Sequence, residues 1–98
     1  MSRRASAHIF RLLGDPIRRI IFERLGRHGP MSAGDLARGL PVGRTNVVQH
    51  LKALEQMRLV DARNSGKRRL YRVDPSGLVP LRQWLAQLDS QLKRGDPT

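Results

Sequence analysis

The sequence predicts a mainly α-helical fold with one small β-hairpin. Two short helical patterns lie between residues 32 and 57, joined by the tight segment Pro41-Val42-Gly43. Two strand-like runs follow around a glycine-containing turn, and further helical patterns lie toward both ends of the chain. Five helices with a two-stranded hairpin after the fourth are typical of a winged helix-turn-helix. We therefore expect residues 1–98 to form one such domain.

The first helix is expected over about residues 5–14. Ile9, Phe10 and Leu13 are apolar at helical spacing, and Gly14 is a residue type that commonly ends a helix. We expect this patch to contribute to an interface between two copies of the chain.

A second helix is expected to begin directly afterwards. Asp15 as N-cap and Pro16 as the first helical residue form a strong start signal. A buried stripe then follows at Ile17, Ile20, Ile21 and Leu25, and Gly26 marks the predicted end. This should be the central helix of the core.

Residues 32–57 carry the predicted helix-turn-helix. Ser32 and Asp35 resemble a capping box with Asp in place of Glu, which would open a short helix that packs Leu36, Ala37 and Leu40 and ends at Pro41. The second helix, residues 44–57, has Val47, Leu51 and Leu54 on one face. We expect that face to be buried.

The opposite face of the second helix carries mostly uncharged hydrogen-bonding groups. These are Thr45, Gln49, Lys52 and Gln56, flanked by Asn46, Val48 and Ala53. Gln and Asn can bond adenine bidentately in the major groove, and an apolar side chain can contact a thymine methyl. The pattern favours a helix that reads bases, and the alternative is an ordinary amphipathic surface helix.

A basic hairpin is expected over residues 59–73. The strands would be Leu59–Arg63 and Arg68–Val73, separated by Asn64-Ser65-Gly66-Lys67, with positive φ at the glycine. Beside a polar helix, its cations are interpreted as a wing that contacts nucleic acid. The alternative is a solvated turn kept soluble by charge.

The last helix, residues 76–93, has an apolar seam. Leucines at positions 78, 81, 85, 88 and 92 form a heptad series over two heptads, which needs a partner helix. Because the other elements already supply a core, we expect the seam to pair with a second subunit. The predicted homodimer interface is Ile9, Phe10, Leu13, Leu81, Trp84, Leu85 and Leu88.

The charge of the chain favours a polyanionic partner. Nineteen Lys and Arg stand against 8 Asp and Glu, which gives a net charge of +11 and a pI near 11.8. A field of that sign concentrates nucleic acid at a protein surface. The cations are dense in residues 42–73, where the polar helix and the hairpin lie, so double-stranded DNA is the expected partner.

Composition also excludes several classes of protein. There is no cysteine, so disulfides and thiolate metal sites are excluded. No apolar stretch approaches the roughly 20 residues of a membrane span, and residues 1–4 lead into a polar helix rather than a signal peptide. We expect a cytoplasmic protein without membrane contact.

Two motifs resemble those of a known family. The segment Leu13-Gly14-Asp15-Pro16-Ile17-Arg18-Arg19-Ile20-Ile21 resembles the L-x-D-P-x-R-x-x-I opening of the ArsR/SmtB-like winged-helix repressors, and Gln49-His50-Leu51-Lys52-Ala53-Leu54 is similar to their Q-H-L-x-x-L core. The resemblance spans about residues 10–88. It implies a homodimeric repressor, joined by its first and last helices, that places two helix-turn-helices on an imperfect palindrome in a promoter.

Carried over residue by residue, the resemblance also implies a set of DNA contacts. These fall on Arg44, Thr45, Asn46, Val48, Gln49 and Lys52 of the reading helix and on Lys67, Arg68 and Arg69 of the wing. His50 matches a family histidine that helps to dock the helix. Gly43 and Val48 stand where serines are common in the family, and the departure at Val48 alters the expected base preference.

The metal response of many family members is not expected here. Their thiolate box would fall around residues 32–36, where this chain has no cysteine, and the last helix offers only Asp89 as a ligand. The remaining alternative is a site that His8, His28 and Asp89 form across a dimer. We expect a metal-independent member without a cofactor.

Other function classes fit the sequence less well. An enzyme is not expected, because the chain has no nucleophile elbow, phosphate loop or paired carboxylate cluster. The main alternative is a nonspecific nucleic-acid-binding architectural protein. RNA modules usually display stacking aromatic residues, and none lies on the proposed reading face. A winged helix that binds a protein partner through the same surface is a third alternative.

Overall fold

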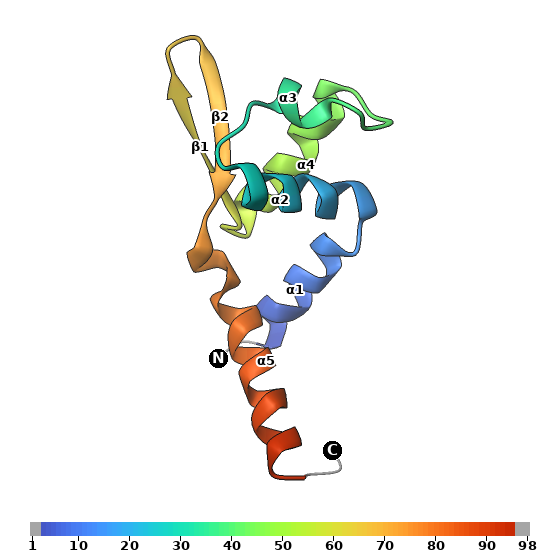
Figure 1. Cartoon of the computed structure of the whole chain (residues 1–98), viewed down its shortest axis with the longest axis vertical. Helices are drawn as coiled ribbons and strands as arrows, with labels where there is room; N and C mark the ends of the chain where they lie inside the picture. The colour runs from blue at the N-terminus through green and yellow to red at the C-terminus, as the bar shows by residue number, and fades with distance from the viewer. Residues whose placement is uncertain (1–2, 96–98) are drawn as a thin grey trace.

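The computed structural model describes residues 3–95. Its elements are α1 (Arg3–Leu13), α2 (Pro16–His28), α3 (Ala33–Ala37), α4 (Arg44–Gln56), β1 (Val60–Ser65), β2 (Arg68–Val73), the 3-10 helix η1 (Pro75–Leu78) and α5 (Val79–Lys93). In Figure 1, α2, α3, α4 and the hairpin form a head, and α1 and α5 form a stalk below it. The predicted fold of five α-helices and a two-stranded antiparallel hairpin is confirmed.

Helix α2 begins where the sequence predicts and ends later. The Asp15 carboxylate accepts a hydrogen bond from the backbone N–H of Arg18 at 3.0 Å, and this bond holds the pKa of Asp15 below its ordinary value. The helix continues two residues past Gly26, near which its end is predicted, to His28. The left-handed backbone that ends it lies at Gly29, with φ +79°.

Helix α3 is shorter than predicted. Ser32 caps it as expected, because its hydroxyl accepts from the Asp35 N–H at 3.2 Å. The helix ends at Ala37 rather than at Leu40, since Arg24 of α2 donates to the carbonyls of Leu36 and Arg38 at 2.9 and 2.7 Å. One guanidinium thus holds the turn between α3 and α4 onto α2.

The second strand of the hairpin lies where the sequence predicts, and the first strand begins and ends later than predicted. Leu59 stays outside β1 because its N–H donates to the Leu54 carbonyl at the end of α4. The strands pair from Val60 opposite Val73 to Ser65 opposite Arg68, so that only two residues form the turn. Gly66 there has the expected positive φ, +63°.

The core lies inside the head and reaches into α1. Its fully buried side chains come from α1, α2, α3, α4 and the segment leading into β1, namely Ile9, Ile21, Leu25, Leu36, Val47, Leu51, Leu54 and Leu59. The placement of Ile9 in the dimer interface is wrong for this reason: it is 1% exposed and already packed against its own chain.

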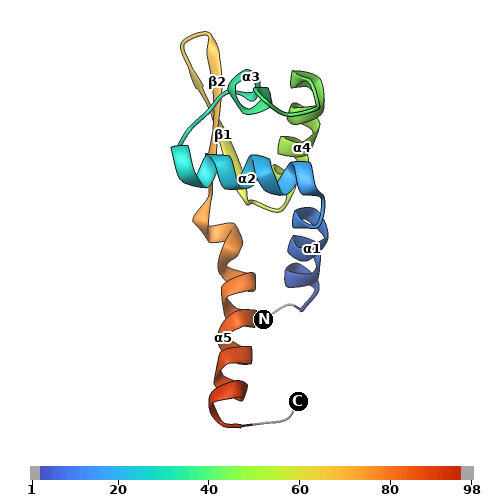
Figure 2. The ribbon, with the colours of Figure 1, turned by 45° about the vertical axis from the view of Figure 1, so that its right-hand side comes forward.

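Helix α5 has no buried residue of its own. It contacts α1 and η1, and in Figures 1 and 2 it continues away from the head beyond the end of α1. Across residues 3–95, no helix combines the length and apolar character needed to cross a membrane.

Candidate nucleic-acid interface

The outer face of α4 is free in the chain. Its inner face is fixed by Val47, Leu51 and Leu54, each 0% exposed. The predicted contacts Arg44, Thr45, Asn46, Gln49 and Lys52 are all exposed. Val48 differs from them, because it is partly buried against the core.

A basic groove separates α4 from the hairpin. Its volume is about 510 Å³. Its lining is Arg44, Val48 and Lys52 from α4, Lys67, Arg68, Arg69 and Tyr71 from the hairpin side, and Ser32, Ala33 and Gly34 at the start of α3. The fold thus gathers cations from two distant parts of the sequence around one open hollow, which is an arrangement suited to a phosphate backbone.

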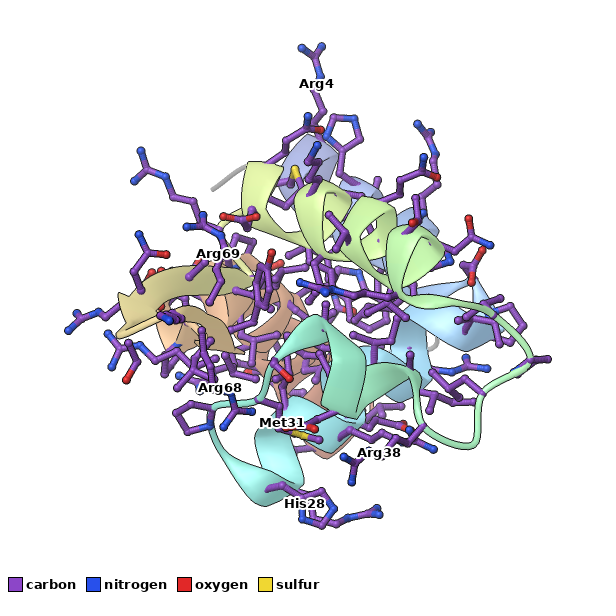
Figure 3. All side chains as sticks on the ribbon, turned by 90° about the horizontal axis from the view of Figure 1, so that it is seen from above. Arg4, His28, Met31, Arg38, Arg68 and Arg69 are labelled. Atoms are coloured by element: carbon purple, nitrogen blue, oxygen red, sulfur yellow. The ribbon has the colours of Figure 1, made fainter. Side chains whose placement is uncertain are left out.

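The three predicted wing cations lie in different surroundings. Arg69 lies 5.8 Å from the centre of the Tyr71 ring and donates to the Asn64 side-chain oxygen at 3.2 Å. Lys67 is exposed in the turn. Figure 3 shows Arg69 between the hairpin and α4, whereas Arg68 lies on the α3 side.

Arg68 is engaged by α3. It forms an ion pair with Asp35 at 2.8 Å and lies 3.4 Å from the Ser32 hydroxyl oxygen. A backbone bridge supports the same contact, since Met31 and Tyr71 exchange hydrogen bonds of 2.9 and 2.8 Å. From the sequence, Asp35 is expected to act only as a capping residue. No local pattern indicates a partner that lies more than thirty positions away.

A second ion pair lies farther along the hairpin. Arg72 donates to Asp61 at 2.9 Å, and this carboxylate raises the pKa of Arg72 above its ordinary value. Arg72 does not line the basic groove. Its charge is therefore satisfied within the hairpin.

The stalk presents an apolar face. Phe10, Trp84, Leu85 and Leu88 are 46%, 39%, 48% and 37% exposed, and Leu92 farther along α5 is 65% exposed. Phe10 and Trp84 meet edge to face, with ring centres 5.0 Å apart. Leu13 and Leu81 are partly buried against the core and border this face. A row of large apolar side chains this exposed is typical of a surface that another protein covers.

The candidate metal ligands are not gathered in the chain. No group of three or more His, Cys, Asp or Glu side chains among residues 3–95 could hold a metal ion. His8, His28 and Asp89 lie on α1, α2 and α5, respectively.

Comparison with known proteins gives two curated relatives. Residues 13–63 match the family described as a helix-turn-helix domain. The chain is 51% identical to the HTH-type transcriptional regulator Rv2034 of Mycobacterium tuberculosis over 79 residues, which cover 81% of this chain and 73% of that protein. It is 26% identical to the transcriptional repressor SdpR of Bacillus subtilis, over 91% of this chain and 94% of that protein.

Solved structures share the same fold. An ArsR-like transcriptional regulator from Rhodococcus sp. RHA1 is 32% identical with a TM-score of 0.77, over 93% of this chain and 85% of that one. The homodimeric winged helix-turn-helix DNA-binding domain Mb0332 of Mycobacterium bovis is 21% identical with a TM-score of 0.68, over 100% of this chain and 95% of that one. At that identity, the second likeness shows the fold alone.

Proposed function

We propose that this chain, which belongs to the ArsR family of DNA-binding helix-turn-helix transcriptional regulators, acts as a homodimeric repressor on an imperfect palindrome in a promoter. The observation that carries the proposal is the basic groove between α4 and the hairpin, beside an exposed row of hydrogen-bonding side chains. Members of this family are regulators rather than enzymes.

In this proposal α4 lies in the major groove of DNA. Thr45, Asn46 and Gln49 are exposed and uncharged, so they are free to bond base edges. Arg44 and Lys52 flank them and contact phosphates. Val48 contacts DNA at most through one methyl group, because its side chain is partly buried against the core.

The hairpin contacts the adjacent backbone or minor groove. Lys67 and Arg69 line the basic groove from the hairpin side, and the stacking of Arg69 on Tyr71 fixes its direction. Arg68 forms an ion pair with Asp35 in the free chain. It contacts a DNA phosphate only if that phosphate takes the place of the Asp35 carboxylate. We therefore propose unequal roles for the three cations of the wing.

The homodimer is proposed from the apolar face of the stalk. Phe10, Trp84, Leu85 and Leu88 are exposed apolar side chains on two helices that contact each other, and a second copy would cover them by two-fold symmetry. The homodimeric state of the Mycobacterium bovis neighbour supports this assembly. Two reading helices would then face half-sites roughly 34 to 36 Å apart, which is one turn of DNA.

Repression is proposed from the relationship to a named repressor. A dimer seated on promoter DNA blocks the polymerase without further chemistry. We propose that this repression is independent of metal, since the chain lacks the cysteines of the family's thiolate box.

The test is selection of binding sites from a pool of random duplexes, followed by sedimentation of the selected complex. We expect an inverted repeat with one-turn spacing and one dimer per site. Recovery of unrelated sequences, bound no more tightly than bulk DNA, would favour an architectural protein and contradict the proposal.

A further inference from the structure

The stalk joins the head through a contact that only glycine permits. Gly77 of η1 is buried against the turn that follows α4. A Cβ atom at this position would lie 2.1 Å from the carbonyl oxygen of Arg58 and 2.6 Å from its carbonyl carbon. Real Cβ atoms do not approach other atoms within 3.0 Å, so any other residue must push η1 and the turn apart.

The turn on the other side of this contact is firmly held. Arg58 has the left-handed φ of +56°, and its N–H donates to the Glu55 carbonyl at 2.9 Å. The next residue, Leu59, donates to the Leu54 carbonyl at 3.0 Å. The Arg58 carbonyl is therefore fixed relative to the end of α4.

The start of η1 is held as firmly. The Asp74 N–H donates to the Leu59 carbonyl at 2.9 Å. Its carboxylate accepts from the hydroxyl and the N–H of Ser76 at 2.7 and 3.0 Å, and these bonds hold the pKa of Asp74 below its ordinary value. Helix α5 follows η1 without a break. The orientation of α5 relative to α4 is thus set by two contacts, the packing of α5 on α1 and the close approach of Gly77 to Arg58.

We propose that Gly77 is a specificity-determining residue, which sets the spacing between the two half-sites that the dimer recognises. This inference rests on the proposed homodimer, in which α5 pairs the subunits and α4 reads the DNA. The contact between Gly77 and Arg58 is the joint between those two helices. The dimer contains this joint once in each subunit, and the two copies are related by the two-fold axis. A change in the joint therefore changes the separation of the two reading helices in both subunits at once.

The size of the effect follows from the distances. The methyl group of an alanine at position 77 must move about 0.9 Å farther from the Arg58 carbonyl oxygen to reach 3.0 Å, the shortest distance that real Cβ atoms show. Two-fold symmetry doubles such a displacement to about 2 Å, which is more than half of the 3.4 Å rise of one base pair. A displacement of that size is enough to weaken the fit of the dimer to its preferred spacing.

The experiment compares Gly77→Ala with the wild type on palindromes whose half-sites are separated by the selected spacing or by one base pair more or fewer. Gly26→Ala is the matched control, since a Cβ at Gly26 meets nothing within 4 Å. We expect the wild type and Gly26→Ala to prefer the same spacing. Gly77→Ala should remain a dimer and lose about tenfold or more of that preference, or shift it by one base pair.

A second variant keeps the proposal testable if Gly77→Ala does not fold. In Arg58→Gly, the glycine adopts the left-handed backbone conformation without strain. It also makes the backbone more flexible, so the carbonyl that contacts Gly77 is held less firmly. The variant also loses a charge, which weakens binding to every spacing alike and leaves their ratio unaffected. We expect a smaller ratio between spacings than in the wild type.

The outcomes separate this inference from the proposed function. A folded, dimeric Gly77→Ala, or Arg58→Gly in its place, that discriminates spacings as the wild type does would overturn the role of Gly77. A wild-type protein that shows no dimer or no spacing preference would instead overturn the homodimeric repressor on which the inference rests.

Discussion

Replacing Leu85 with aspartate should convert the proposed dimer into monomers. Leu85 is 48% exposed in the single chain, in the middle of the apolar seam of α5. Full burial of a leucine side chain is worth about 1.5 to 3 kcal/mol, so covering the exposed half contributes about 1 kcal/mol. Two-fold symmetry places two copies in the interface, which raises the contribution to about 2 kcal/mol.

The introduced carboxylates add a larger cost. Each one would lose water against the apolar face of the partner, at a penalty of several kcal/mol per ion. The sum is at least about 5 kcal/mol, which corresponds to an increase of more than a thousandfold in the dimer dissociation constant. Sedimentation equilibrium over a range of protein concentrations measures this constant directly.

The matched control is Gln83→Asp. This residue lies on the same helix, is exposed, and stands about 200° around the helix from Leu85. Gln83→Asp introduces the same aspartate into the same helix, but on the side away from the apolar seam. The dimer should therefore persist. Far-UV circular dichroism should report folded protein for both variants. If Leu85→Asp were folded and as dimeric as the wild type, Leu85 would lie outside the interface.

Three further predictions concern the head. Gln49→Ala should weaken binding to the selected site by roughly 1 to 3 kcal/mol and relax specificity at one or two base positions, and an equal loss on random DNA in a titration would exclude base reading. Arg68→Ala should weaken binding to cognate and random DNA alike, and the slope of log affinity against log salt concentration should become flatter by about one unit. An unchanged slope would mean that Arg68 pairs with Asp35 and contacts no phosphate. Asp15→Ala should lower the urea midpoint by removing the cap of α2, whereas Asp15→Asn should keep the cap. Because the pKa of Asp15 is lowered on folding, its contribution to stability is present above its ordinary pKa of 3.8 and is lost as the pH falls through the lower folded value. Urea unfolding of the wild type and Asp15→Asn in this range checks the sign: an equal acid loss in both would exclude Asp15 as its source.

Local chemistry made much of the head predictable. Asp15 and Ser32 begin their helices as expected because a short side-chain acceptor beside a free N–H acts within a few residues. The buried row on α4 follows from helical spacing alone. Gly66 adopts positive φ because a tight hairpin turn requires it.

The incorrect predictions share a different cause, which is contact with distant parts of the chain. The end of α3 depends on Arg24, which reaches it from α2. Ile9 was assigned to a surface because the pattern of α1 does not reveal which apolar side chain turns toward the core. The close contact of Gly77 with Arg58 follows no local pattern either, since it exists only where η1 meets the end of α4.

The candidate interface likewise has features that local sequence patterns predict and features that depend on the fold. Helical periodicity identified the exposed face of α4, and the charge of the hairpin identified the wing. Neither pattern could pair Arg68 with Asp35 or place Arg69 on Tyr71, because these contacts depend on how the hairpin packs beside α3 and α4. The unequal surroundings of the three wing cations therefore became apparent only from the fold.

The most direct test of sequence-specific regulation is binding of the purified protein to its own upstream intergenic DNA, compared with random DNA of equal length. The titration is run across salt concentrations, with and without divalent metals. We expect a preference of roughly a thousandfold or more for the upstream DNA, unchanged by metal. Equal affinity for both DNAs would contradict sequence-specific regulation, and loss of binding with one metal would contradict metal independence.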